Sequence, residues 1–163
     1  MKIFHISLLI SLNIMLSADL SQTINDFFKQ ELNFEQNSFN SATNNFEKSF
    51  GKFKRNSNNT IEIEVFSPFN EKYFISSDGI EIYDLDFDQK KFIRSEDISN
   101  VLLDILNNGF SEKKLDIKHY DEKKFSLTKD GKEYSFTFLN INNLQIKYKD
   151  NMNVDTLINF SIP

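Results

Sequence analysis

The alternation of apolar and polar residues along the chain predicts a protein built mainly of β-strands. The clearest stretch begins at the dipeptide Asp78-Gly79, which favours a tight turn because glycine tolerates a positive φ angle. Ile80 and Ile82 then alternate with Glu81, and the apolar pattern starts again at Phe92-Ile93. A period of two residues is typical of a strand with one buried face. This stretch therefore predicts two hairpins of an antiparallel sheet.

The same alternation recurs along most of the chain. We predict about eleven strands, at residues 30–38, 46–55, 60–66, 71–77, 80–84, 90–94, 115–121, 125–128, 132–139, 144–149 and 154–161. Polar turns separate them, including a loop predicted at Asn37–Asn45, and Gly51 predicts a bulge or bend in the second strand. Many short strands with frequent turns are typical of a barrel or a strongly curved sheet.

Two segments have helical periodicity instead. The apolar stripe of the first consists of Leu20, Ile24, Phe27 and Phe28, and that of the second of Ile98, Val101, Leu102, Ile105 and Leu106. Ser95 is a suitable N-cap for the second helix, and Glu96 and Asp97 in its first turn interact favourably with the helix dipole. Asn108-Gly109 is a typical helix end. The pattern thus predicts an α+β protein that is mainly β, with two short amphipathic helices.

The N-terminal segment predicts export. Lys2 precedes an apolar run from Ile3 to Leu16, and Ser17-Ala18 supplies the small residues of a cleavage site. These are the parts of a secretory signal. We therefore expect residues 1–18 to be a cleavable signal peptide and residues 19–163 to form a single domain that is soluble after cleavage. A retained membrane anchor is the alternative, although the apolar run is short for a membrane-spanning helix.

Composition narrows the possible functions. The formal net charge of −5 disfavours a nucleic-acid-binding surface, because such a surface needs clustered lysine and arginine. The chain has no cysteine, which excludes disulfides, thiolate metal sites, cysteine catalysis and a lipidated cysteine. Phenylalanine accounts for 18 of the 163 residues. Either an AT-rich genome or a need for apolar lining beyond the protein's own core explains this abundance, and composition leaves both explanations open.

The sequence contains no recognisable catalytic or metal-binding motif. His119 is the only histidine after the predicted signal, and it has no partner nearby in the sequence. The series Asp84-x-Asp86-x-Asp88 resembles the start of a calcium loop, but Gln89 and Ser95 occupy the positions where such a loop has glycine and glutamate. We therefore predict a binding protein rather than an enzyme, with no metal and no cofactor. A curved sheet with an aromatic-rich inner face suits an acyl ligand, and an ordinary packed core is the alternative.

Several motifs follow one another in a recognisable order. They are the segment Asp19-Leu20 to Gln36 with Phe34-x-Gln36 at its end, Lys54-Arg55, Pro68, Ser77-Asp78-Gly79, Tyr83-Asp84-x-Asp86-x-x-Gln89, and the apolar helix Asn100–Leu106. Together they resemble the outer-membrane lipoprotein carrier family (LolA) over most of residues 19–163. The chain departs from the family pattern at Asn56, which replaces a proline, and at Ile61 and Ile63, where the family often has Phe and Trp. The family also continues into a further strand and loop beyond the position of Pro163.

This resemblance implies an open, strongly curved antiparallel half-barrel of about eleven strands, with a lid of short helices over an apolar cavity. It implies a monomeric periplasmic chaperone that receives acylated outer-membrane lipoproteins from an inner-membrane, ATP-driven lipoprotein-releasing complex. The chaperone would pass them to an outer-membrane lipoprotein receptor. By the same resemblance, Arg55 would latch the lid by donating hydrogen bonds to its backbone carbonyls, a role that suits arginine better than lysine.

The inward positions of the predicted strands supply the candidate lipid-binding residues. These are Leu32, Phe34, Ile61, Ile63, Val65, Ile80, Ile82, Phe136, Phe138, Ile146 and Tyr148. Three other functions are compatible with the same pattern: the outer-membrane receptor itself, a periplasmic lipid- or lipoprotein-sensing module of the same fold, and an exported enzyme. The missing lipidation cysteine, the length of the chain and the missing catalytic set, respectively, disfavour them.

Overall fold

The computed structural model describes residues 20–41, 43–97, 101–110, 116–129, 131–150 and 152–163. The signal peptide predicted at residues 1–18 lies outside these ranges. The helices within them are α1 (Leu20–Phe27), the 3-10 turn η1 (Ser95–Asp97) and α2 (Val101–Asn108). The strands are β1 (Leu32–Asn40), β2 (Asn45–Arg55), β3 (Ile61–Ser67), β4 (Glu71–Ile75), β5 (Gly79–Asp84), β6 (Gln89–Arg94), β7 (Asp116–His119), β8 (Lys124–Lys129), β9 (Lys132–Asn140), β10 (Asn143–Lys149) and β11 (Asp155–Ser161).

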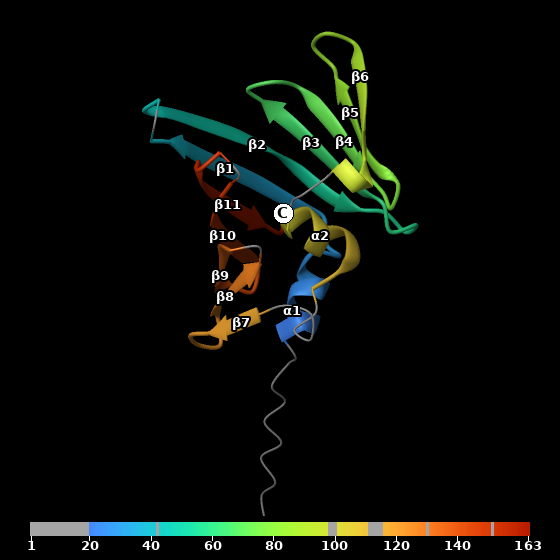
Figure 1. Ribbon diagram of the computed structural model, residues 1–163. Coiled ribbons are helices and arrows are strands. Elements are labelled where there is room, and N and C mark those ends of the chain that lie inside the picture. Colours follow the sequence, from blue (N-terminus) through green and yellow to red (C-terminus); the bar gives the residue numbers. More distant parts are fainter. Residues whose placement is uncertain (1–19, 42, 98–100, 111–115, 130, 151) are drawn as a thin grey trace, which may run out of the picture.

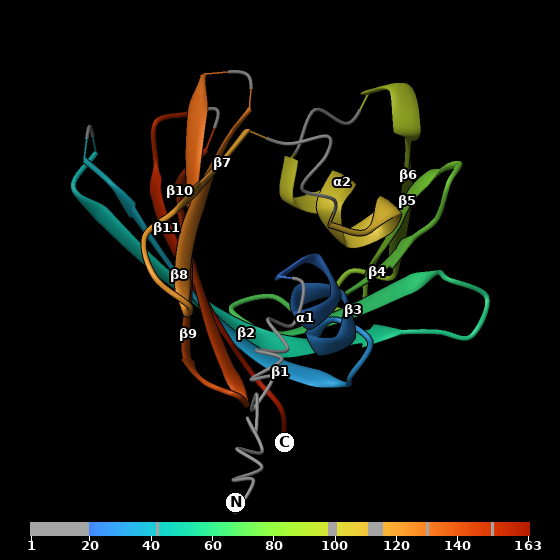
Figure 2. The same cartoon turned by 90° about the horizontal axis from the view of Figure 1, so that it is seen from below.

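The eleven strands of the described residues form one antiparallel sheet, in the order β6-β5-β4-β3-β2-β1-β11-β10-β9-β8-β7. Strands that follow one another in the chain are neighbours, except that α2 separates β6 from β7 and the last strand pairs with the first. The sheet is open, with β6 and β7 as its edges. It curves around α1 and α2, which lie on its inner side (Figures 1 and 2).

The structure confirms the predicted strands and the presence of both predicted helices. The predicted first turn of the second helix, with Ser95 as its N-cap, forms the 3-10 turn η1 instead, and Ile98 of its apolar stripe lies outside the described residues. The loop predicted at Asn37–Asn45 is wrong in extent, because β1 continues to Asn40 and β2 begins at Asn45. Phe39 and Phe46 lie directly opposite each other in this part of the hairpin. An aromatic pair across two strands stabilises their pairing, so polar residues that are typical of loops extend the sheet here.

Two glycines allow strands to approach closely. A Cβ atom on Gly51 would lie 1.8 Å from the carbonyl oxygen of Glu64, and the register between β2 and β3 shifts at this position, where the sequence predicts a bulge or bend. Gly79 has a φ angle of 151°, and a Cβ atom there would lie 2.1 Å from the carbonyl oxygen of Ile93. No other residue fits either position without a backbone shift.

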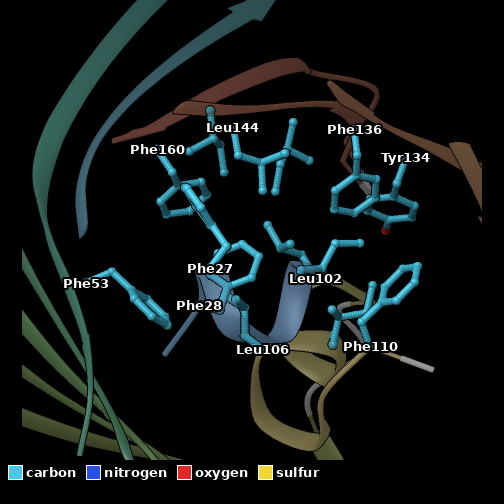
Figure 3. Packing of buried hydrophobic residues seen from close by; sticks show 14 of the residues in the cluster. Phe27, Phe28, Phe53, Leu102, Leu106, Phe110, Tyr134, Phe136, Leu144 and Phe160 are labelled. Atoms are coloured by element: carbon cyan, nitrogen blue, oxygen red, sulfur yellow. The ribbon is translucent and has the colours of Figure 1, made fainter. Parts of the chain in front are cut away.

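The core lies between the inner face of the sheet and the two helices (Figure 3). Phe28, which directly follows α1, packs edge-on against Phe53 and Phe160, with ring centroids 5.7 and 5.3 Å apart. Phe110, which follows α2, packs against Phe125 at 5.5 Å. Such aromatic pairs contribute about 0.5–1.5 kcal/mol each beyond the burial of their area. Aromatic contacts therefore attach both helices to the sheet.

The outer face of the sheet carries glutamates that are paired with lysines. Examples are the pairs Lys48–Glu35, Lys72–Glu64 and Lys90–Glu81. Each pair is partly exposed, and exposed ion pairs contribute about 0–1 kcal/mol. The outer face is therefore a solvated surface whose carboxylates have local counter-charges.

Candidate ligand-binding pocket

A pocket of about 520 Å³ lies between α2 and the inner face of the sheet. Leu102, Leu103 and Leu106 line it from the helix, and residues of β1 to β6, β10 and β11 line it from the sheet. Its volume falls within the range of about 300–1,000 Å³ that is typical of small-molecule sites. The pocket occupies the part of the inner face that the helices do not fill.

Isoleucine side chains line the pocket near the C-terminal end of β4. Ile75 lies opposite Ile61 on one neighbouring strand and opposite Ile80 on the other, and Ile80 lies opposite Ile93. Ile75, Ile80 and Ile93 line the pocket, whereas Ile61 is completely buried beside them. The antiparallel register thus joins isoleucines from four strands into one continuous surface.

Polar side chains line the opposite end of the pocket. They are Gln36 of β1, Glu47 and Ser49 of β2, and Glu71 and Tyr73 of β4. The Tyr73 hydroxyl donates a hydrogen bond to Glu71 Oε2. Burial, assisted by this bond and by the charge of Glu71, raises the pKa of Tyr73 well above its usual value. The hydroxyl therefore stays protonated and remains a donor at neutral pH.

Arg55, the last residue of β2, connects the sheet to α2. Its Nη2 donates a hydrogen bond to the backbone carbonyl of Leu106 in the last turn of α2. Carbonyls in this turn lack partners within the helix, and the helix dipole favours a cation beside them. Burial lowers the pKa of the Arg55 guanidinium, but arginine remains charged at every physiological pH. The guanidinium of Arg55 thus bonds α2 to the sheet.

Two further contacts hold α2 and the residues after it. The Asn25 side chain of α1 accepts a hydrogen bond from the Phe110 backbone N–H at 2.8 Å and donates one to the Phe110 carbonyl at 3.0 Å. Lys129 of β8 lies 3.0 Å from Asp104 of α2. α2 therefore makes polar contacts with a strand in each half of the sheet, β2 and β8. The segment after α2 is hydrogen-bonded to α1.

The predicted lipid-binding residues divide into two groups. Phe34, Ile63, Val65, Ile80, Ile82 and Tyr148 line the pocket. Leu32, Ile61, Phe136 and Ile146 are completely buried in the core, and Phe138 packs against Phe27 of α1 at a centroid distance of 5.7 Å. All of them point to the inner side of the sheet, but α1, α2 and their flanking residues pack over the second group.

Several residues of the pocket were not among the predicted site residues. Leu102 and Leu106 belong to the apolar stripe of the predicted second helix, so helical periodicity was a usable signal for them. Glu47 and Glu71 gave no signal, because a carboxylate on the inner face looks the same in the sequence as one on the outer face. Asn25 pairs with Phe110, a residue distant in the chain, and nothing local predicts such a contact.

The carboxylates of Asp84 and Asp86 and the side chain of His119 do not line the pocket. No group of three or more His, Cys, Asp or Glu side chains is arranged there to hold a metal ion. Asp84 accepts hydrogen bonds from the backbone N–H groups of Asp86 and Phe87, and Asp86 accepts one from Asn70, so these carboxylates stabilise turns. His119 is exposed on β7.

A second hollow, of about 600 Å³, lies against Phe39, Lys147 and Leu157. These side chains alternate with the buried residues of their strands and face outward. Lys124 and Glu133 also line the hollow. Charged groups of both signs around an outward-facing depression suit an apolar ligand less well than the pocket beside α2.

Comparisons with known proteins assign no family to this chain. No protein-family model matches it, and no curated protein matches it significantly. Among the described residues, no helix is both long and apolar enough to cross a membrane. A functional interpretation therefore depends on the order of the sequence motifs and on the geometry of the pocket.

Proposed function

We propose that the protein is a periplasmic chaperone that binds the acyl chains of lipoproteins and carries them to the outer membrane. The observation that carries this proposal is the pocket itself. Its isoleucine surface and the leucines of α2 form an apolar cavity for a hydrocarbon chain, and Arg55 and Lys129 bond α2 to the sheet beside it. A cavity closed by a helix that can move away can take up a chain and release it.

A carrier is needed because acylated proteins do not cross water unaided. At about 0.8 kcal/mol per methylene, three acyl chains of roughly fifteen methylenes expose apolar surface worth on the order of 35 kcal/mol. A protein that moves such a cargo must shelter this surface and yet release it. Many weak apolar contacts achieve this better than a few strong polar ones, and isoleucine and leucine side chains supply such contacts.

Five of the eleven predicted lipid-binding residues are covered by α1, α2 and their flanking residues. Acyl chains can reach these side chains only if the helices leave the sheet. We therefore propose that α1 and α2, here called the lid, move away from the sheet when cargo binds.

Lid movement gives a role to the predicted lipid-binding residues that are now buried. Leu32 and Phe138 contribute to the core around α1, and Phe136 packs beneath Phe110 after α2. These side chains become cavity lining once the lid opens. In this scheme Arg55 is the latch that stabilises the closed, empty form through its bond to Leu106.

The proposed partners follow from the family resemblance. The protein would receive acylated outer-membrane lipoproteins from an ATP-driven lipoprotein-releasing complex in the inner membrane and deliver them to a lipoprotein receptor in the outer membrane. It would act as a monomer, without a cofactor and without catalysing a reaction. A sensing module with the same pocket is the competing interpretation, and it predicts binding without onward transfer.

Displacement of a neutral fluorescent apolar probe tests whether the pocket takes acyl chains. We expect a triacylated lipopeptide to displace the probe at micromolar concentration or below, and the same peptide without its acyl chains to leave it bound. Probe that is not displaced by the lipopeptide would contradict the proposal. Onward transfer to purified receptor separates a carrier from a sensing module.

A further inference from the structure

The charged side chains that line the pocket are all acidic. Among the described residues that line it, Glu47 and Glu71 are the only ionisable side chains apart from tyrosines, and none is a lysine, arginine or histidine. Two carboxylates contribute nothing to the binding of a hydrocarbon chain. They act instead on the polar head group of an amphiphilic ligand.

Both carboxylates stand at a distance from the isoleucine surface. Glu71 is the first residue of β4 and Ile75 is the last, so about 13 Å of strand separates them at about 3.3 Å per residue. Glu47 lies near the start of β2, whereas Arg55 and its contact with α2 lie at the end of that strand. A ligand whose tail enters beside α2 therefore has its head among Glu47 and Glu71.

The inner carboxylates also differ from the outer ones in their partners. Glu35, Glu64 and Glu81 on the outer face each have a lysine within ion-pair distance. In the described part of the chain, Glu47 and Glu71 have no basic partner. Glu47 accepts from the Asn45 side chain and Glu71 from the Tyr73 hydroxyl, both of which are neutral donors. The described residues therefore supply no counter-charge to the carboxylates at this end of the pocket.

We infer that the pocket selects amphiphiles whose head carries a protonated amine, and that it disfavours amphiphiles with an anionic head. This inference rests on the proposed function and specifies its ligand. An ammonium group near either carboxylate gains Coulomb attraction and can donate a hydrogen bond to the oxygen that Asn45 or Tyr73 does not use. A carboxylate or phosphate in the same place meets like charge. The amine can be the free α-amino group of a diacylated polypeptide, since the third chain of a triacylated one occupies that group, or the amine of a lipid.

Three single-chain probes of equal length test the inference: dodecylamine, dodecanol and dodecanoate, each below its micelle concentration. Their affinities are measured by displacement of the neutral apolar probe at pH 7 and low salt. We expect dodecylamine to bind at least tenfold more tightly than dodecanoate, with dodecanol in between. Added salt should reduce the difference, because screening weakens interactions between partly exposed charges.

Variants assign the selectivity to residues. The double variant Glu47→Gln/Glu71→Gln should bind the amine and the carboxylate about equally while keeping its affinity for dodecanol. Glu81→Gln, on the outer face, is the matched control and should keep the tenfold preference. An equal affinity of the wild-type protein for amine and carboxylate, or an unchanged preference in the double variant, would overturn the inference. Failure of dodecanol to bind would instead count against the acyl-binding function itself.

Acylated peptides identify the source of the amine. A diacylated lipopeptide with a free N-terminus should bind more tightly than the same lipopeptide after N-acetylation, and the difference should vanish in the double variant. A lipid amine is the natural ligand head if N-acetylation has no effect and dodecylamine still shows the preference. If the protein prefers neither dodecylamine over dodecanoate nor the free N-terminus over the acetylated one, the pocket does not recognise amines.

Discussion

Arg55 is the proposed latch of the lid, because its guanidinium donates a hydrogen bond to the Leu106 carbonyl of α2. A hydrogen bond from a charged donor contributes about 1.5–3 kcal/mol, which corresponds to a change of about tenfold or more in the balance between closed and open lid. We expect Arg55→Leu to shift this balance towards the open form. Bound lipoprotein should then be retained, and its transfer to the receptor should be slowed by about tenfold in a reconstituted transfer assay.

The other arginine of the chain provides the control for this prediction. Arg94 on β6 is exposed and pairs with Glu96 and Asp97. Arg94→Leu should therefore transfer cargo at the wild-type rate. Arg55→Lys should fall between the two, because lysine keeps the charge but not the planar donor group. Wild-type transfer by Arg55→Leu would remove the latch from the mechanism.

Tyr148 gives a prediction for the pH dependence of stability. Burial, and then the neighbouring Tyr134 and Asp150, raise the pKa of Tyr148 to about 12. In the unfolded chain the pKa is close to 10, so above that pH the unfolded state loses a proton that the folded state keeps. Folding stability must then fall as pH rises from about 10 to 12. We expect Tyr148→Phe to reduce the fall by about 1–2 kcal/mol in urea titrations at pH 9 and pH 11.5.

An exposed tyrosine controls for changes that do not depend on burial. Tyr120→Phe removes a tyrosine whose exposed fraction is 49%, and its urea titrations provide the reference for those of Tyr148→Phe. If Tyr148→Phe and the wild-type protein lose the same stability between the two pH values, the pKa of Tyr148 is not raised in the folded state.

The alternation of apolar and polar residues predicted which face of the sheet a side chain lies on, but not which residues it contacts. Ile63 and Ile146 show the same period-two pattern in the sequence, and both point to the inner side of the sheet. Ile63 lines the pocket, and Ile146 is completely buried. The difference arises from where α1 and α2 rest on the sheet, and the alternation of a strand carries no information about an element that packs on it.

At the scale of elements, Asn25 joins the two helices into one unit. Its side chain pairs with both backbone groups of Phe110, so movement of α1 is transmitted to the segment that follows α2. We expect Asn25→Leu to lower the free energy of unfolding by about 1–3 kcal/mol, because it leaves a partly buried donor and acceptor unpaired. Asn25→Asp keeps the acceptor alone and should have an intermediate effect in urea unfolding.

Local exchange distinguishes a lost contact from general destabilisation. In Asn25→Leu, hydrogen exchange should accelerate in α2 and at Phe110 more than in the central strands β1 and β11. Equal acceleration in all these elements would show that Asn25 stabilises the whole domain without coupling the helices. Wild-type stability of Asn25→Leu would show that the pair with Phe110 contributes nothing.

Hairpins were predictable from the sequence, and the joining of the two halves of the sheet was not. Each hairpin joins segments that adjoin in the chain, so turn residues and alternation define it locally. The pairing of β1 with β11 brings Phe34 opposite Phe160, and no local signal connects residues so far apart in the chain. The position of α2 beside Arg55 also depends on this global arrangement. The proposed latch therefore came from family resemblance and not from the pattern of residues.

At the scale of the whole molecule, the inner face divides into a core and a pocket, and substitutions can separate them. Ile63→Trp places a large side chain in the pocket, so we expect at least a tenfold loss of affinity for acyl ligands, with a loss of stability of at most about 1–3 kcal/mol. Ile146→Val removes one methylene from the core and should cost about 0.5–1.5 kcal/mol without changing affinity. Probe displacement and urea unfolding of both variants make the comparison.

The opposite pattern would show that the pocket and the core have been assigned the wrong roles. That pattern is a loss of acyl affinity in Ile146→Val together with unchanged affinity in Ile63→Trp. A loss in both variants would mean that ligand binding involves the whole inner face even when the lid is closed.

Native mass spectrometry tests the central claim most directly. The protein is purified without detergent from a periplasm that also contains a triacylated lipoprotein, and its mass is recorded intact. We expect a one-to-one complex that disappears when the lipoprotein lacks its acyl chains. A bare protein, still bare after incubation with the energised lipoprotein-releasing complex, would contradict the carrier function and leave only the fold.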